Sequence, residues 1–217
     1  MADYTTEVRG RVGSSAATSS MADATESQLR FDSQGATVIS GLHGAYTEQT
    51  KRGKVFTIAN QAAVVTVVGL TTTYTGLMLS NPVGSATYIS VLRVGLAFIV
   101  AQPTTGSVFG LEAGYNSSTN VTHTTPVAPL CSLIGSTDLG VGKGDVSATL
   151  PTAPVLVYSF GSVLTEAITA GFEQGPAFFD IKGGIVLKPG GYCGIYTTIA
   201  SGAASMVASI QYEEIPM

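Results

Sequence analysis

The chain has 217 residues, of which 45% are hydrophobic but only 11% are charged, and its net charge is −4 at pH 7. Ordinary soluble domains carry about 25% charged residues, so the deficit of charge is the strongest signal in the composition. The largest basic group, Lys51, Arg52 and Lys54, is too small for the concentrated basic face that binds nucleic acid through its phosphates. The composition therefore argues against a nucleic-acid partner.

Residues 1–35 predict an extended N-terminal arm. The segment begins MADYTTEVRG, without the apolar run of a secretory signal, and we expect a protein made in a cytoplasm. It continues with VGSSAATSSMADATESQ, whose small polar residues bury too little apolar surface to offset the entropy of ordering. Helix formers favour one helical turn between Met21 and Leu29. Otherwise we expect the arm to become ordered only on a partner.

Residues 36–217 predict a single β domain, because short runs of Val, Ile, Thr, Tyr and Phe alternate with Gly, Pro, Asn and Ser. The predicted strands are 36–40, 54–60, 62–68, 76–81, 86–101, 107–114, 120–127, 154–161, 177–183, 184–190, 192–199 and 205–214. With no long helix and no repeat of fixed period, this pattern predicts an all-β fold, an antiparallel β-sandwich of jelly-roll type. The apolar segment 87–101 is shorter than the ~20 residues of a membrane helix, so we expect no membrane span.

Two of these segments carry opposite patterns. In SMVASIQYEE, Met206, Ala208, Ile210 and Tyr212 alternate with more polar residues, which predicts a strand buried on one face. In contrast, VLVYSF at 155–160 is apolar on both faces. Such a strand belongs in the middle of a sandwich or at an interface between subunits.

The residues that carry chemistry are few. His43 and His123 are the two histidines, so one chain cannot supply a three-histidine metal site. The Gly-x-Ser-x-Gly motif of α/β-hydrolases is absent, although a Ser-His-Asp triad on another fold stays open. Either histidine beside a carboxylate and a serine in one cleft would reveal it. GVGKGD at 140–145 departs from the phosphate-loop pattern and is interpreted as a flexible loop tip. We expect no enzyme and no cofactor.

The carboxylates are scattered, and we interpret them as solvated loop charges. They are Glu112, Asp138, Asp145, Glu166, Glu173, Asp180, Glu213 and Glu214. Cys131 and Cys193 match no metal-binding spacing. Two separate buried thiols are favoured over a disulfide, because we expect a protein that is made in a cytoplasm and not secreted.

The distribution of charge predicts an assembly. Between Val55 and Leu111 the single charged residue is Arg93. A monomeric sandwich would place Lys and Glu on its outer faces and edges, so we expect another subunit to cover this stretch, most simply in a homotrimer. A lone arginine there should reach solvent at a rim or pair with a carboxylate. The candidate interface residues are Arg93, Met78 and Tyr88 in the neutral stretch, with Arg9 and Arg11 in the arm.

Four segments carry a resemblance to a known class of proteins. They are RFDSQGATVISGLHGAYTEQTKRGKVFTIANQAAVVTV, GLMLSNPVGS, GGIVLKPGGYCGIYTT and IQYEEIP. Together they make the chain, over about residues 30–217, similar to β-rich structural proteins of tailed bacteriophages, which include head decoration (cement) and head-fibre proteins. The resemblance implies a virion protein made in the host cytoplasm, a trimer bound to the major capsid protein on the outside of the head. It would stabilise the shell by non-covalent contacts.

Two alternatives remain from the sequence. One is a receptor-binding or glycan-binding fibre or spike module, whose exposed loops would use Tyr46, Tyr115, Asn116 and Asn120. The other is a hydrolase of unfamiliar type built around one of the histidines.

Overall fold

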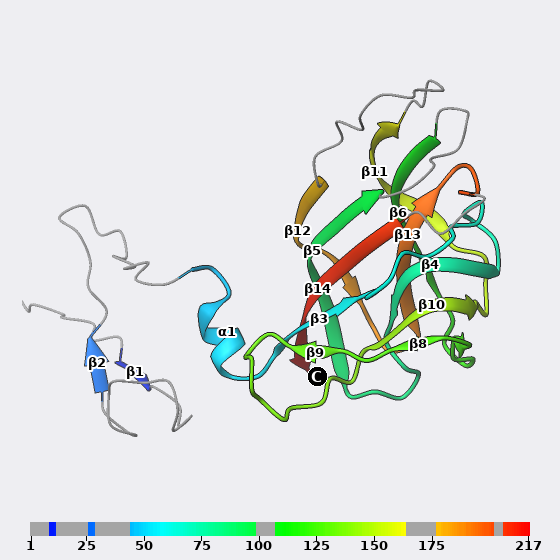
Figure 1. Ribbon diagram of the computed structural model, residues 1–217. Helices are drawn as coiled ribbons and strands as arrows, with labels where there is room; N and C mark the ends of the chain where they lie inside the picture. The colour runs from blue at the N-terminus through cyan, green and yellow to red at the C-terminus, as the bar shows by residue number, and fades with distance from the viewer. Residues whose placement is uncertain (1–8, 12–25, 29–43, 99–106, 164–176, 202–205) are drawn as a thin grey trace, which may run out of the picture.

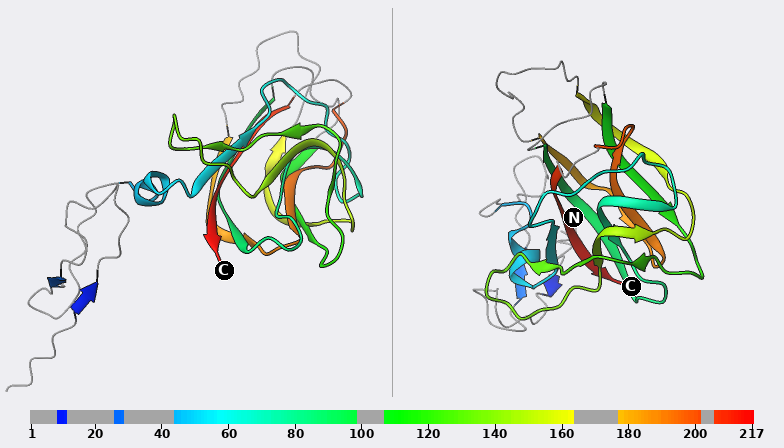
Figure 2. Two further views of the ribbon diagram at one scale, coloured as in Figure 1. Left: turned by 90° about the horizontal axis from the view of Figure 1, so that it is seen from below. Right: turned by 45° about the vertical axis from the view of Figure 1, so that its right-hand side comes forward.

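The computed structural model of the chain describes residues 9–11, 26–28, 44–98, 107–163, 177–201 and 206–217. Within these ranges the molecule is two antiparallel sheets packed face to face (Figure 1; Figure 2). The predicted strand at 36–40 and His43 lie outside the described residues. The first strand of the sandwich begins at Val55, after the five-residue helix α1 (Thr47–Lys51).

Each sheet has its own strand order. Across the five-stranded sheet the strands are β12 (Ala177–Leu187), β5 (Thr87–Phe98), β14 (Met206–Pro216), β3 (Val55–Ala59) and β9 (Leu130–Cys131). Across the seven-stranded sheet they are β11 (Val155–Val163), β6 (Ser107–Tyr115), β13 (Gly191–Thr197), β4 (Thr73–Ser80), β10 (Lys143–Thr149) and β7 (Thr122–His123), with β8 (Pro126–Val127) also paired to β10. A separate pair is β1 (Arg9–Arg11) with β2 (Glu26–Gln28).

The connectivity is that of a jelly roll. From β3 to β6 each strand crosses to the opposite sheet, β6 and β11 lie in the same sheet, and from β11 to β14 the chain crosses again at every step. These eight strands form two four-stranded layers, β12-β5-β14-β3 and β11-β6-β13-β4, as a double Greek key requires. The segment from β7 to β10 is inserted between β6 and β11 and lengthens both sheets at the β3 and β4 side. The predicted jelly-roll sandwich is confirmed.

The core lies between the two layers and follows from strand alternation. Met206, Ala208, Ile210 and Tyr212 of β14 are all buried, and the residues between them are half-buried, as predicted. At the edge formed by β11 and β12, the rings of Phe160 and Phe179 stack with centroids 4.0 Å apart, which joins the two sheets.

The neutral stretch is covered mainly by the chain itself. In β4 and β5 most residues are buried within this one chain. Met78 is 1% exposed and lies in a second apolar cluster, whose other members are Tyr74, Val121, Ala148, Leu150 and Tyr192. For β4 and β5 the expectation that a neighbouring subunit covers this stretch is therefore wrong, because other strands of the same chain already cover them.

Several local predictions need correction. Residues 62–68 form one isolated bridge, Val64 to Met206, instead of a strand. Segment 140–145 is not simply a loop tip, because β10 begins at Lys143. The helical turn predicted around residue 26 is replaced by β2. The strands predicted at 177–183 and 184–190 are one strand, β12, whose pairing with β5 is irregular between Asp180 and Ile185.

Candidate functional site

The structure does not bring the predicted interface residues together on one surface. Arg93 reaches the surface of β5 and pairs with Asp180 of β12, Nε to Oδ1 2.7 Å, with both side chains about half exposed. Tyr88 is 37% exposed at the start of the same strand, whereas Met78 is buried. Arg9 and Arg11 lie in β1, and their side chains are outside the described structure. The prediction that Arg93 finds solvent or a carboxylate is confirmed.

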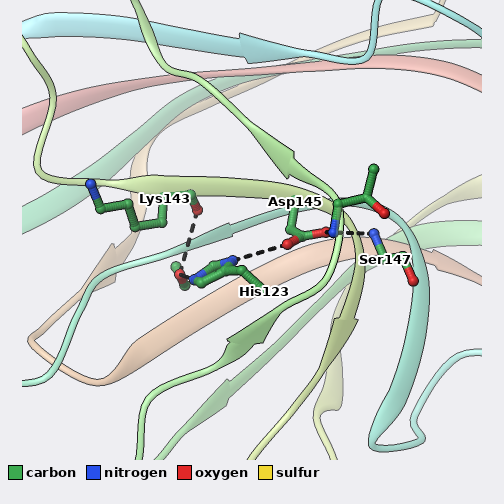
Figure 3. Close-up of polar contacts among 6 residues, drawn as sticks. His123, Lys143, Asp145 and Ser147 are labelled. Carbon is green, nitrogen blue, oxygen red and sulfur yellow. Dashed lines mark hydrogen bonds and ion pairs between the residues drawn. The ribbon is translucent and has the colours of Figure 1, made fainter.

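A polar cluster forms where the inserted segment meets β4 and β10 (Figure 3). The Nδ1 atom of His123 lies 3.2 Å from Oδ2 of Asp145, and its Nε2 atom lies 3.4 Å from Oγ of Ser80. The cluster borders a cleft of about 240 Å³ that is also lined by Asn120, Lys143 and Gly191. Sequence reasoning left this juxtaposition open, because the three residues are brought together only by strand pairing.

The Asp145 carboxylate holds this cluster in place. Its side chain has no exposed surface, and its Oδ1 atom accepts hydrogen bonds from the amides of Thr125 (3.1 Å) and Ser147 (2.6 Å). A buried carboxylate needs such donors to replace its water. The pairing of β10 with β4 shifts between Asp145 and Ser147, and such a bulge can re-aim a side chain locally. Asp145 is therefore a structural carboxylate, and its interpretation as a solvated charge was wrong.

The contacts follow the order of a Ser-His-Asp triad, but the surroundings do not suit acyl transfer. Ser80 is 3% exposed, and its hydroxyl also donates to the carbonyl of Lys143 at 3.4 Å. A triad needs backbone amides free to stabilise an oxyanion. The amides of Asn81, Gly190 and Gly191, which line this cleft, all donate to carbonyl groups of the chain. The arrangement therefore ties three strands together.

A second buried carboxylate, Glu112, lies in the seven-stranded sheet. It is 1% exposed, and its Oε2 atom accepts a hydrogen bond from the amide of Leu70 at 2.8 Å. Among the described residues its Oε1 atom has no hydrogen-bond partner. Burial raises the pKa of Glu112 to about 7, and the Leu70 amide opposes the rise. Its interpretation as a solvated loop charge was wrong, because Glu112 lies in β6, within the strand predicted at 107–114, and its side chain is buried.

The glycine-rich segment before β10 also binds a carboxylate of the chain itself. The amides of Val141 and Gly142 donate to Oε1 of Glu214, at 2.6 and 2.9 Å. Glu214 is 7% exposed at the end of β14. Two backbone amides of this glycine-rich segment are thus occupied within the chain, and Glu214 is a third carboxylate wrongly interpreted as solvated.

Metal and thiol chemistry find little support in the described residues. Cys131 and Cys193 are both buried and free, as predicted. Burial raises the pKa of the Cys193 thiol to about 12, which suppresses the reactive thiolate. Across the described ranges, His, Cys, Asp and Glu form no group of three that could hold a metal ion.

Three of the four residues expected to bind glycans, all except Tyr46, have side-chain contacts within the chain. The Tyr115 ring is covered by the Lys188 ammonium, 3.9 Å from its centroid. The Oδ1 atom of Asn116 accepts from the amides of Ser118 and Thr119, and that of Asn120 accepts from the amide of Val83.

An exposed apolar surface lies along the outer edge of β11. Four consecutive apolar residues are exposed there: Val155 (63%), Leu156 (41%), Val157 (41%) and Tyr158 (40%). Among the described strands β11 pairs only with β6, so its other side has a free hydrogen-bonding edge. The sequence predicted that this segment lies either in the middle of the sandwich or at an interface between subunits. The first alternative is wrong, because β11 is an edge strand. A free apolar edge of this kind invites protein contact.

Comparisons with protein family models, with curated proteins and with solved structures found no match to this chain. Among the described residues no helix is long and apolar enough to cross a membrane.

Proposed function

We propose that this chain is a structural protein of a bacteriophage particle, a capsid decoration protein. It binds the outside of the head as a homotrimer and stabilises the shell by non-covalent contacts with the major capsid protein. The observation that carries the proposal is the exposed apolar edge of β11, which a monomeric sandwich would blunt with charge and which therefore favours an assembled protein. The resemblance of the sequence to phage structural proteins supplies the context.

The distribution of polar groups favours this function over catalysis. The buried carboxylates Asp145 and Glu214 are engaged by backbone amides, and the Ser80 hydroxyl is turned inward to a carbonyl. These contacts stiffen the sandwich. A cement protein needs such stiffness, because it reinforces a shell by staying bound in one shape.

Rebinding to deficient heads tests the proposal. Heads of the phage that encodes the chain are assembled without it, mixed with purified protein and sedimented. We expect saturable binding at a fixed ratio to the major capsid protein, with added protein raising the temperature at which the heads release DNA. Heads that already carry the protein serve as the control and should bind almost none. Protein that remains in the supernatant at all concentrations would contradict the proposal.

Salt sets a second condition on the same experiment. Because only 11% of the residues are charged, we expect binding to persist at about 1 M salt, where the Debye length falls to about 3 Å. Contacts made mainly by charge would be lost there.

A further inference from the structure

Two surfaces formed by uncharged residues lie at opposite edges of the sandwich, where Figure 1 shows β11 and β9. One is the β11 edge, defined as Val155, Leu156, Val157 and Tyr158. The other is the β9 groove, a cavity of about 470 Å³ at the far ends of both sheets. The groove is lined by Thr57, Ala59, Asn60, Gln61, Ala62, Val64, Pro126, Val127, Ala128, Leu130 and Val146.

The positions of these surfaces follow from strand order. In the seven-stranded sheet β11 is the first strand, while β10 and β8, which border the groove, lie at the other end. In the five-stranded sheet β9 and β3 also border the groove and lie at the end opposite β12. One edge of the chain therefore projects apolar side chains, and the opposite edge has an apolar hollow.

We infer that copies of this chain assemble head to tail, with the β11 edge of one copy seated in the β9 groove of the next. This inference rests on the proposed function, since it specifies how the trimer forms. Contacts between two different surfaces of one chain are heterologous, and such contacts close into a ring when the rotation between copies allows. A ring of three uses every edge and every groove.

Charge favours a second copy as the occupant. β11, from Val155 to Val163, contains no charged residue, and no residue lining the β9 groove is charged. Burying a charged partner in such a groove would leave its charge unpaired, which is costly. An uncharged apolar edge meets no such penalty, and this chain carries one.

Size also fits. At about 30 Å³ for each water-sized group, the groove of about 470 Å³ holds roughly fifteen heavy atoms. The side chains of Val155, Leu156 and Val157 together have about ten heavy atoms, so the groove has room for them. The β11 edge presents Val155, Leu156 and Val157 in succession, followed by the larger Tyr158.

Paired variants test the inference. The edge variant is V155D with V157D, and the groove variant is A128D with L130D, all at exposed positions. We expect each to dissociate the wild-type oligomer into monomers and to raise the dissociation constant between copies at least 100-fold. The control is L139D, at a leucine that is 90% exposed outside both surfaces, and it should assemble normally. Circular dichroism and thermal melting check that each variant is folded.

Mixing the two variants identifies the arrangement. An edge variant keeps an intact groove, and a groove variant keeps an intact edge, so an equimolar mixture should form a heterodimer of about 44 kDa, twice the mass of the 22.2 kDa chain. The heterodimer cannot close into a ring. A mixture that stays monomeric would overturn the head-to-tail contact, because an edge that pairs with a second edge gives no such complementation.

A further variant separates this inference from the proposed function. If deletion of residues 1–43 yields monomers while the edge and groove variants remain trimers, the arm holds the trimer and the inference is overturned. If the edge variant still forms trimers and these trimers bind heads, the head-to-tail contact is likewise contradicted, whereas the proposed decoration function is not.

Discussion

Replacing Glu112 with glutamine should remove a specific dependence of stability on pH. The folded protein raises the pKa of this carboxyl group from 4.5 to about 7, chiefly by burial. At about 1.4 kcal/mol for each pKa unit, the ionised carboxylate costs the fold about 3 kcal/mol. The cost is fully present only above pH 7, where the group is ionised in both states.

The sign follows from proton binding. Between pH 4.5 and pH 7 the folded state holds more of this proton than the unfolded state, so the free energy of unfolding falls as pH rises through that window. Glu112→Gln lacks the titrating group. We expect the variant to be about as stable as the wild type near pH 5 and about 2–3 kcal/mol more stable at about pH 8. The gain in stability is smaller if the glutamine NH2 group, which replaces Oε1, has no hydrogen-bond acceptor beside it.

Urea unfolding at about pH 5, 6, 7 and 8 measures this effect, with tyrosine fluorescence as the signal and a fixed protein concentration, since assembly shifts apparent stability. Glu213→Gln, at a half-buried glutamate of β14, is the matched control and should keep the pH dependence of the wild type. A Glu112→Gln variant that loses stability at the highest pH, or keeps the wild-type slope, would refute the role given to burial.

Three further substitutions test the contacts of the fold. Asn60→Ala should lower the free energy of unfolding by about 2–4 kcal/mol, because the buried Asn60 amide hydrogen-bonds to Met206 O, Ala208 N and Ala62 O. The control is Gln61→Ala, at an exposed residue beside it, which should lower the free energy of unfolding by less than about 0.5 kcal/mol in the same urea titration. Arg93→Ala should lower the free energy of unfolding by less than about 1 kcal/mol, since its ion pair is exposed. A double-mutant cycle with Asp180 measures the interaction energy of the pair. Asp145→Ala should lower the free energy of unfolding by about 2–4 kcal/mol, because it leaves buried amides without a hydrogen-bond partner. Hydrolysis of a nitrophenyl ester should proceed at the same rate with Ser80→Ala as with the wild type. An ester activity that depends on Ser80 would contradict the structural role of the cluster.

How far the sequence predicts this molecule depends on the range of the interactions involved. The alternation in β14 is local, so the sequence alone identifies the buried face from Met206 to Tyr212. The strand spacing likewise predicts the sandwich. The burial of Asp145 depends on pairing between β10 and β4 and on amides from β10 and the loop after β7, which no local pattern records.

The neutral stretch shows the same limit for composition. Absence of charge marks surfaces that are removed from water, but it does not say what removes them. The Met78 side chain is covered by residues of the same chain, whereas the apolar side chains of β11 stay exposed. Only the strand order distinguishes these cases, because β4 lies within its sheet and β11 lies at an edge.

Cryo-microscopy of the assembled particle tests the central proposal most directly. We expect three jelly-roll sandwiches around a common axis on the outer surface of the head, with the β11 edge of each copy against the β9 groove of its neighbour. Particles that contain no density for this chain would contradict its assignment as a virion protein.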